Sequence, residues 1–346
     1  MTGNKSGHRR LFGISVGIPA YSRCRELQEL LESIDSQTVL PTEITICEDH
    51  SIERLTIRSI VEQWRERFAE SGCRINYHEN EVNLGYDGNL RKVIAVSHSP
   101  WVMLLGNDDL LLENCVETVE HFLSTHQDAT MVSRSFLRFD KDIKKPIGVS
   151  RIASRDEVFT ARNNSSNMIF RSCGFVGGLI VSREWASRIA TARYDGTLYY
   201  QIYLGSVSFC EAGIGYIAEP IIGGRACNPP LFGSAEVERE IHVPGSYTPK
   251  GRAKMWAAVL AIVDDIGAQY GLDLHSGIKR ELEVRQSFHV FEMAAGSDRR
   301  KLSELRDELK RLGLFSHVYP RAFFLVDWVL GSRAKTFYAL ARKLMQ

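Results

Sequence analysis

Apolar positions in the first 130 residues alternate between short β-branched runs and longer stretches with helical spacing. Strands are predicted at 14–18, 43–47, 74–78 and 101–105, and helices at 23–34, 55–69, 86–97 and 115–126. In the first of these helices the residues on one face are Leu27, Leu30, Leu31 and Ile34. Regular alternation of this kind predicts an α/β fold, with a Rossmann-like, mostly parallel sheet and helices on both faces.

The pattern is less regular from 129 to 225. Strands are predicted at 131–139, 175–181 and 215–222 and a short helix at 184–191, separated by polar and glycine-rich loops. Residues 227–250 contain four prolines, and we expect a long loop there, because such loops in compact domains are usually active-site flaps or disordered. Helices are predicted again at 256–270, 278–295, 299–312 and 320–346.

These patterns divide the chain into four expected parts. A polar tail at 1–11 is expected to be disordered, as untethered termini usually are. An α/β domain follows at 12–225, then a flexible loop at 226–250 and a C-terminal helical region at 251–346. No internal repeat or low-complexity tract interrupts them.

Composition and charge exclude some classes of function but do not identify one. The 346 residues are 44% hydrophobic with a formal net charge of +1, so we expect no nucleic-acid partner. The seven cysteines are scattered and form no Cys-x-x-Cys pair, as expected of reduced thiols. No apolar window resembles a signal peptide or reaches the length of a membrane span. We therefore expect a cytoplasmic protein.

Polar motifs stand where the predicted strands end. They are Pro19-Ala20-Tyr21-Ser22-Arg23 after the first strand, Glu48-Asp49-His50-Ser51 after the second, and Gly106-Asn107-Asp108-Asp109 after the fourth. A further group, Asn83, Gly85 and Asn89, stands at the start of the third helix. Ligands bind at the carboxyl ends of strands in open α/β sheets, so we expect all four groups to meet at one edge. The adjacent acids Asp108 and Asp109 offer oxygen-only ligands, which suit Mg²⁺ or Mn²⁺.

Each motif also has a purely structural explanation. Pro19 can end a strand, and Tyr21 can be an aromatic residue at the edge of the core. Asp49 or Ser51 can cap the helix that follows, and the acids at 108 and 109 can do the same for the helix near 113. Asn83 and Gly85 are typical turn residues, and a turn there would also shape a site.

Taken in this order, the motifs resemble those of the inverting glycosyltransferases of family 2, which have the GT-A fold. The resemblance covers 12–130 well and 170–225 loosely. It departs at Ser22, at Glu48 and at Gly106, where the family commonly has Asn, Asp and the first acid of Asp-x-Asp-Asp. A similar Gly-x-Asp-Asp form occurs in relatives that transfer deoxyhexoses such as abequose or rhamnose.

The resemblance implies a role for each motif. It makes 12–130 the nucleotide-binding half and 131–225 the acceptor half. Asp49 would accept a hydrogen bond from the donor's nucleobase, and Asp108 and Asp109 would hold the Mn²⁺ or Mg²⁺ that bridges the diphosphate. The nucleotide site as a whole would comprise Pro19, Ala20, Tyr21, Arg23, Asp49, Asn83, Gly85, Asn89, Asn107 and Asp108.

An inverting transfer also needs a general base within reach of the acceptor hydroxyl. The family usually supplies an acid from its second half. We expect Asp195, which precedes the apolar run at 198–204, with Glu211 as the alternative.

The expected function is metal-dependent transfer of a sugar from a nucleotide-diphosphate donor to a glycan or polyprenyl-linked oligosaccharide in surface polysaccharide (O-antigen) synthesis. A sugar nucleotidyltransferase has a similar sheet but needs a glycine-rich loop with a basic residue after the first strand. The Pro-Ala-Tyr-Ser-Arg sequence found there argues against it. A catalytically degenerate sugar-nucleotide binder is a further alternative, because Gly106 replaces the first acid of the metal motif.

Residues 320–346 combine aromatic and aliphatic residues with five basic residues and one acid, Asp327. A basic amphipathic helix with Trp and Phe can lie in a membrane interface, here the inner face of the plasma membrane. Packing on the catalytic domain, or on another subunit of a homo-oligomer, is the competing explanation.

Overall fold

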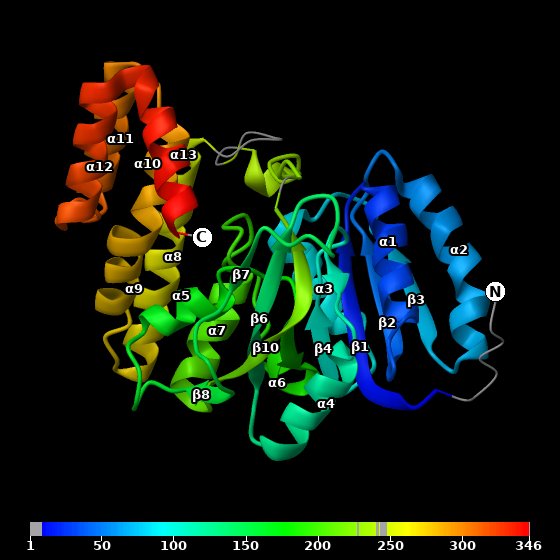
Figure 1. The fold of residues 1–346 in the computed structure, drawn as a ribbon. Coiled ribbons are helices and arrows are strands. Elements are labelled where there is room, and N and C mark those ends of the chain that lie inside the picture. The colour runs from blue at the N-terminus through cyan, green and yellow to red at the C-terminus, as the bar shows by residue number, and fades with distance from the viewer. Residues whose placement is uncertain (1–8, 227, 240–241, 243–247, 346) are drawn as a thin grey trace.

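A mixed ten-stranded sheet organises the chain (Figure 1). The computed structural model describes residues 9–226, 228–239, 242 and 248–345. The strands along the sheet, in spatial order, are β3 (Arg74–Glu79), β2 (Leu40–Glu48), β1 (Leu11–Ala20), β4 (Trp101–Leu104), β9 (Leu179–Ser182), β6 (Met131–Phe139), β10 (Ile214–Arg225) and β5 (Leu110–Leu111). Two short strands at the side are β7 (Gly148–Ser150), which pairs with β6, and β8 (Glu157–Phe159), which pairs with β10.

The sheet is mostly parallel, as predicted. β1 pairs in parallel with both β2 and β4, β2 with β3, and β6 with β10. β9 is antiparallel to both of its neighbours, β4 and β6. The strand was predicted at 175–181 but begins later, at Leu179. The preceding residue, Gly178, has a φ of +81° and turns the chain there. The carboxyl ends of β1, β2 and β4 meet at one edge.

Helices cover both faces of the sheet. On one face lie α1 (Cys24–Asp35), α2 (Arg54–Glu70) and α4 (Cys115–Thr125); on the other lie α3 (Gly85–Val96), α5 (Asn167–Cys173), α6 (Arg183–Arg188) and α7 (Tyr200–Glu211). Side chains of β4 point to both faces. Met103 packs with the cluster that includes α1, α2 and α4, whereas Val102 and Leu104 pack with the cluster that includes α3, α5, α6 and α7. A strand buried on both faces is continuously apolar, which explains its sequence.

Helix α7 was not predicted, and its sequence shows why. Every residue from Tyr200 to Phe209 is buried, so the helix has no polar face and no amphipathic period. From the sequence, we identified only an apolar run at 198–204. Tertiary burial, rather than helical periodicity, specifies this element.

The C-terminal region is helical, as predicted, and gathers at the end of the sheet opposite to α1 and α2 (Figure 1). Its elements are α8 (Pro249–Tyr270), α9 (His275–Glu281), a π-helical turn (Leu282–Gln286), α10 (Ser287–Ala294), α11 (Arg299–Arg311), α12 (Val318–Leu330), a 3₁₀ turn (Gly331–Arg333) and α13 (Ala334–Met345). The helix predicted at 320–346 is broken at Gly331, which has a φ of 55°. One apolar cluster continues from α5 and α7 into α8–α13.

Two predicted irregular segments fall only partly within the described residues. Residues 1–8 of the predicted tail lie outside them, while Leu11 already belongs to β1. In the predicted loop at 226–250, positions 227, 240–241 and 243–247 also lie outside them, and a 3₁₀ turn (Glu236–Glu238) forms between. No helix in the described ranges is long and apolar enough to cross a membrane.

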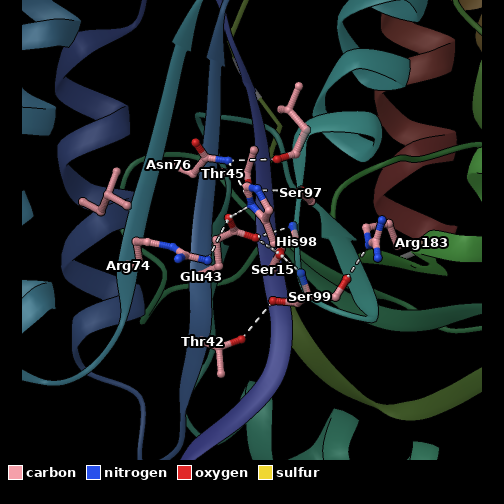
Figure 2. Close-up of polar contacts among 12 residues, drawn as sticks. Ser15, Thr42, Glu43, Thr45, Arg74, Asn76, Ser97, His98, Ser99 and Arg183 are labelled. Carbon is pink, nitrogen blue, oxygen red and sulfur yellow. Dashed lines mark hydrogen bonds and ion pairs between the residues drawn. The ribbon is translucent and has the colours of Figure 1, made fainter.

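A buried carboxylate fixes the amino-terminal side of the sheet, away from the motifs (Figure 2). Glu43 on β2 is 1% exposed and accepts a hydrogen bond from Ser15. It also accepts one from the backbone N–H of His98 at 2.8 Å, and the His98 ring Nδ1 lies 2.8 Å from its other oxygen. These bonds hold the segment that leads from α3 into β4.

Candidate active site

A cavity of about 330 Å³ opens where β1, β2 and β4 end. The residues of the four motifs that line it are Pro19, Tyr21, Arg23, Asp49, Asn83, Gly85, Asn89, Gly106, Asn107, Asp108 and Asp109. Ala20 is fully buried and does not line the cavity. The structure therefore brings together all but one of the residues expected to bind the nucleotide or a metal.

The Asp108–Asp109 turn is held by Arg225 at the end of β10. The Arg225 backbone N–H donates to Asp109 Oδ1 at 3.1 Å, and its Nε donates to the Asp108 carbonyl at 3.0 Å. Its guanidinium also pairs with Glu29 on α1. The N-cap of α4 is Asn114, without a side-chain cap, so neither acid caps that helix.

Asp108 faces the opposite wall of the cavity. Its Oδ2 accepts hydrogen bonds from Arg23 and from Asn228 Nδ2, the latter at 2.9 Å. Arg23 also donates to the carbonyl of Pro229. Asn228 and Pro229, which follow β10, thus lie against the motif turns.

Asp109 occupies space that two glycines leave. A Cβ on Gly177 would lie 2.3 Å from Asp109 Oδ2, and one on Gly106 would lie 3.1 Å from it. Burial and the neighbouring Asp108 carboxylate raise the pKa of Asp109 well above its ordinary value, against the opposing effect of the Arg225 N–H. Burial likewise lowers the pKa of nearby Arg134 to about 10.

The two acids fit a hard divalent cation that also binds other oxygens. Adjacent buried carboxylates repel one another, and a cation between them relieves that repulsion. Mg²⁺ and Mn²⁺ prefer oxygen ligands, and Mg²⁺ commonly uses one or two carboxylates together with water and phosphate. Across the described residues no cluster of three or more His, Cys, Asp or Glu side chains offers a complete protein cage. The donor set therefore suits a cation shared with a phosphate ligand.

Asp49 is directed toward the start of α3. Its Oδ1 accepts hydrogen bonds from Asn80 Nδ2 at 2.7 Å and from the Leu84 N–H at 2.8 Å. Burial raises its pKa to about 6, although these donors favour the ionised form. The N-cap of α2 is Glu53, without a side-chain cap, so Asp49 does not cap that helix.

Backbone strain is concentrated around the cavity. Among the described residues, five that are not glycine have positive φ, and four of them belong to the turns at the cavity: Ser22 (53°), Arg23 (61°), His50 (56°) and Leu198 (65°). Such conformations persist only where surrounding contacts impose them, and they cluster at functional sites.

The two residues expected to act as general base lie elsewhere. Asp195 forms a two-pronged ion pair with Arg91 on α3, in which Arg91 Nη2 donates to Oδ2 at 2.9 Å. Glu211 accepts hydrogen bonds from Trp185 Nε1 at 2.8 Å and from the Tyr270 hydroxyl at 2.6 Å. Neither carboxylate lines the cavity. Sequence alone could not show these partners, because they come from distant elements.

The prediction from sequence missed several residues of the cavity wall. Phe175, Tyr199, Gln201 and Glu238 line it. Glu238 accepts from the Tyr86 N–H at 2.8 Å and the Gly233 N–H at 2.6 Å, which ties the segment after β10 to the start of α3. Of the residues that were missed, only Glu238 lies in a segment that the sequence had linked to the site, the proline-rich loop at 227–250.

Comparisons with known proteins agree with this arrangement. Residues 15–182 match the model of the family described as Glycosyl transferase family 2. Abequosyltransferase RfbV of Salmonella typhimurium is 28% identical over 227 residues, which cover 62% of this chain and 67% of that protein.

Solved structures show the same fold. S. aureus TarS 1-349 superposes with a TM-score of 0.57 at 11% identity, covering 96% of this chain and 92% of that one. The mannosyltransferase PcManGT from Pyrobaculum calidifontis, in complex with GDP-Man and Mn²⁺, gives 0.52 at 14% identity, covering 92% and 86%. At such identities the likeness concerns the fold alone, and it confirms the predicted fold class.

Proposed function

We propose that this chain, whose residues 15–182 match the model described as Glycosyl transferase family 2, moves a sugar from a nucleotide-diphosphate donor to a hydroxyl of a glycan or lipid-linked oligosaccharide. The proposed setting is surface polysaccharide synthesis, and the proposed transfer is metal-dependent and inverting. The observation that carries the proposal is that Asp49 and the Asp108–Asp109 pair line one cavity.

The donor nucleotide occupies the part of the cavity formed by the first half of the chain. Asp49 accepts a hydrogen bond from the nucleobase, and Tyr21 stacks near that base. Asn83, Gly85 and Asn89 shape the wall at the start of α3. Solved structures of the same fold bind UDP-GlcNAc and GDP-Man, which supports a nucleotide-sugar donor without choosing its base.

Asp108 and Asp109 hold Mn²⁺ or Mg²⁺ at the donor diphosphate. A bound cation stabilises, as a Lewis acid, the charge that develops on the leaving diphosphate. Arg225 orients both acids through the contacts described above. The Mn²⁺ in the PcManGT complex supports this choice of cofactor class.

Asp195 has a different role in this proposal from the one that its sequence position suggested. Its ion pair with Arg91 fixes the segment before α7 on α3, so we assign it a positioning role. Glu211 joins Trp185 to Tyr270 and helps to pack α7.

The central test measures nucleotide binding and nucleotide release with Mn²⁺ and a panel of donor sugars. Asp108→Ala and Asp109→Ala should each lower release at least about 100-fold, as expected when a charge-stabilising group is lost. Asp128→Ala, an exposed acid on the turn after α4, is the matched control and should leave release unchanged. If both cavity variants kept wild-type binding and turnover, the proposal would be wrong.

The products separate the alternatives. A glycosyltransferase releases a nucleoside diphosphate, whereas a sugar nucleotidyltransferase releases pyrophosphate from a nucleoside triphosphate. A degenerate binder binds the donor and releases neither product.

We also propose that α12 contacts an anionic lipid surface on the cytoplasmic side. Val318, Leu325 and Val329 are 64%, 59% and 69% exposed, and their spacing places them on one face of the helix. One basic residue, Arg321, lies on α12 itself, and Arg333, Lys335 and Arg342 follow on the 3₁₀ turn and α13, whereas Asp327 is buried. A helical region with both exposed apolar residues and basic residues suits an interface with anionic headgroups.

Sedimentation with anionic vesicles tests this contact. The double variant Leu325→Asp, Val329→Asp should lose most of the vesicle-bound fraction, whereas Val149→Asp, at a residue 52% exposed on β7, should retain it. Equal sedimentation of all three proteins would refute the contact. If light scattering without lipid instead showed that the double variant breaks an oligomer, this face would be a subunit interface.

A further inference from the structure

Gln201 is a buried polar side chain in the wall of the cavity. It lies in the first turn of α7, is 3% exposed and lines the cavity. The apolar residues Phe175, Val176, Leu198 and Met255 line the same cavity, as do the charged residues Glu238 and Arg252. A buried polar atom loses the hydrogen bonds that water would supply, unless a partner replaces them.

In the carboxamide of Gln201, the described residues offer a hydrogen-bond partner to the nitrogen but not to the oxygen. Its Nε2 donates to the Leu198 carbonyl at 3.4 Å. Its Oε1 is buried and has no hydrogen-bond partner within the described residues. The opposite amide orientation would place the oxygen against the Leu198 carbonyl oxygen, so the bond to Leu198 assigns the orientation. Native structures rarely leave such an acceptor unsatisfied.

The backbone that carries Gln201 is rigidly supported. Asp87 on α3 accepts from the Leu198 N–H and from the Tyr200 N–H, both at 2.8 Å. This support maintains Leu198 at a φ of 65°, a strained value for a branched side chain. Asp87 is itself 1% exposed. The position of Gln201 is therefore built into the fold rather than left to a mobile loop.

Gln201 also shares its cavity with the paired acids. Gly174, Phe175 and Val176 line the cavity, and the next residue, Gly177, packs directly against Asp109 Oδ2. One continuous wall thus joins the proposed diphosphate end of the cavity to the start of α7. Gln201 and the paired acids therefore line the same cavity.

We propose that Gln201 is a specificity residue whose Oε1 accepts a hydrogen bond from a hydroxyl of a bound sugar. The inference rests on the proposed glycosyl transfer. The donor sugar and the acceptor sugar both offer hydroxyl groups of this chemistry, and the experiment has one arm for each. A site built to bond a hydroxyl rejects the analogue that lacks it, because its own acceptor is then left unpaired.

The experiment measures kcat/KM for hydroxylated sugars and for their single-deoxy analogues. One arm follows acceptor-free hydrolysis of donor analogues, and the other follows transfer to acceptor analogues. The wild-type protein should prefer one hydroxylated sugar over its deoxy analogue by about 10- to 100-fold. Gln201→Met, which keeps the length of the side chain but lacks the acceptor, should reduce that preference to about 1 in the same arm.

Gln37→Met is the matched control. Gln37 is 1% exposed, lies outside the cavity, and bonds through Nε2 to the Leu112 carbonyl at 2.8 Å. This variant should lower Tm without changing the preference for a hydroxyl, which separates recognition from a general loss of stability. An unchanged preference in Gln201→Met in both arms, with turnover intact, would overturn this inference alone. Absence of turnover in every protein, wild type included, would overturn the proposed function together with it.

Discussion

The guanidinium of Arg91 on α3 forms a two-pronged ion pair with the carboxylate of Asp195, which precedes α7 by five residues. The pair joins α3 to the segment that carries Tyr199 and Gln201. Asp87, one turn earlier on α3, holds the same segment through two backbone N–H groups. Two acids therefore fix the geometry of the cavity wall across α3 and α7.

Asp195→Ala should lower kcat less than about tenfold, because the proposed role of this carboxylate is to position the wall rather than to remove a proton. Loss of a general base typically costs about 10²- to 10⁴-fold. Arg91→Ala should have the same effect, and the double variant should be no worse than either single one, as expected when both residues act through one contact. Steady-state kinetics of the three variants measure this. A loss in Asp195→Ala that far exceeds the loss in Arg91→Ala would restore Asp195 as the base.

Donor binding should weaken as the pH falls through 6. Burial raises the pKa of Asp49 from its ordinary value to about 6, so the carboxylate is mostly ionised at pH 7 and mostly protonated at pH 5. The ionised form is the one that accepts a hydrogen bond from a nucleobase N–H. Calorimetric titration of a nucleoside diphosphate between pH 5 and 8 measures the effect.

Asp49→Asn is the control for this pH dependence. It should bind more weakly at pH 7 and lose the part of the pH dependence that belongs to Asp49, because an amide does not titrate. The phosphate groups of the ligand titrate equally with both proteins, so their contribution cancels when the affinity of Asp49→Asn is compared with that of the wild type at each pH. Parallel curves for the two proteins would exclude Asp49 as the titrating group.

Gly177→Ala should impair the cation site without unfolding the protein. The added Cβ would lie 2.3 Å from Asp109 Oδ2, so the carboxylate must move. We expect at least a tenfold rise in the Mn²⁺ concentration needed for half-maximal turnover. Gly13→Ala in β1 is the control, since its nearest contact would be an ordinary 3.5 Å to Pro100. A Gly177→Ala protein with wild-type Mn²⁺ dependence would contradict the assigned position of Asp109.

Glu43→Gln should destabilise the protein at neutral pH and flatten its acid denaturation. Burial alone would raise the pKa of Glu43, but hydrogen bonds from His98 and Ser15 hold it below the usual value. A carboxyl with a lowered folded pKa contributes stability above its unfolded pKa, near 4.3, and loses it as the pH falls through the folded value.

Urea unfolding at pH 7 should show a loss of about 1–3 kcal/mol for Glu43→Gln, the range for a disrupted buried hydrogen-bond group. The difference from wild type should shrink below pH 4. A difference that stays constant from pH 7 to pH 3 would mean that the charge of Glu43 does not contribute.

The sequence by itself determined the parts of the protein that depend on local pattern. Alternating strands and helices before residue 130 follow from hydrophobic periodicity, and parallel strands bring their carboxyl ends to one edge. The positions of Asp49, Asp108 and Asp109 in one cavity were therefore predictable. Sequence also indicated that the proline-rich segment after β10 would be irregular.

Only the tertiary structure decided which side chains meet across the chain. Asp195 and Arg91 are 104 positions apart, and Arg225 reaches the Asp108–Asp109 turn from 116 positions away. No local period encodes such pairs, because they depend on how helices and strands pack. The same packing buries α7 on every side, so that the helix has no amphipathic period, and among the described residues it leaves the oxygen of Gln201 without a hydrogen-bond partner.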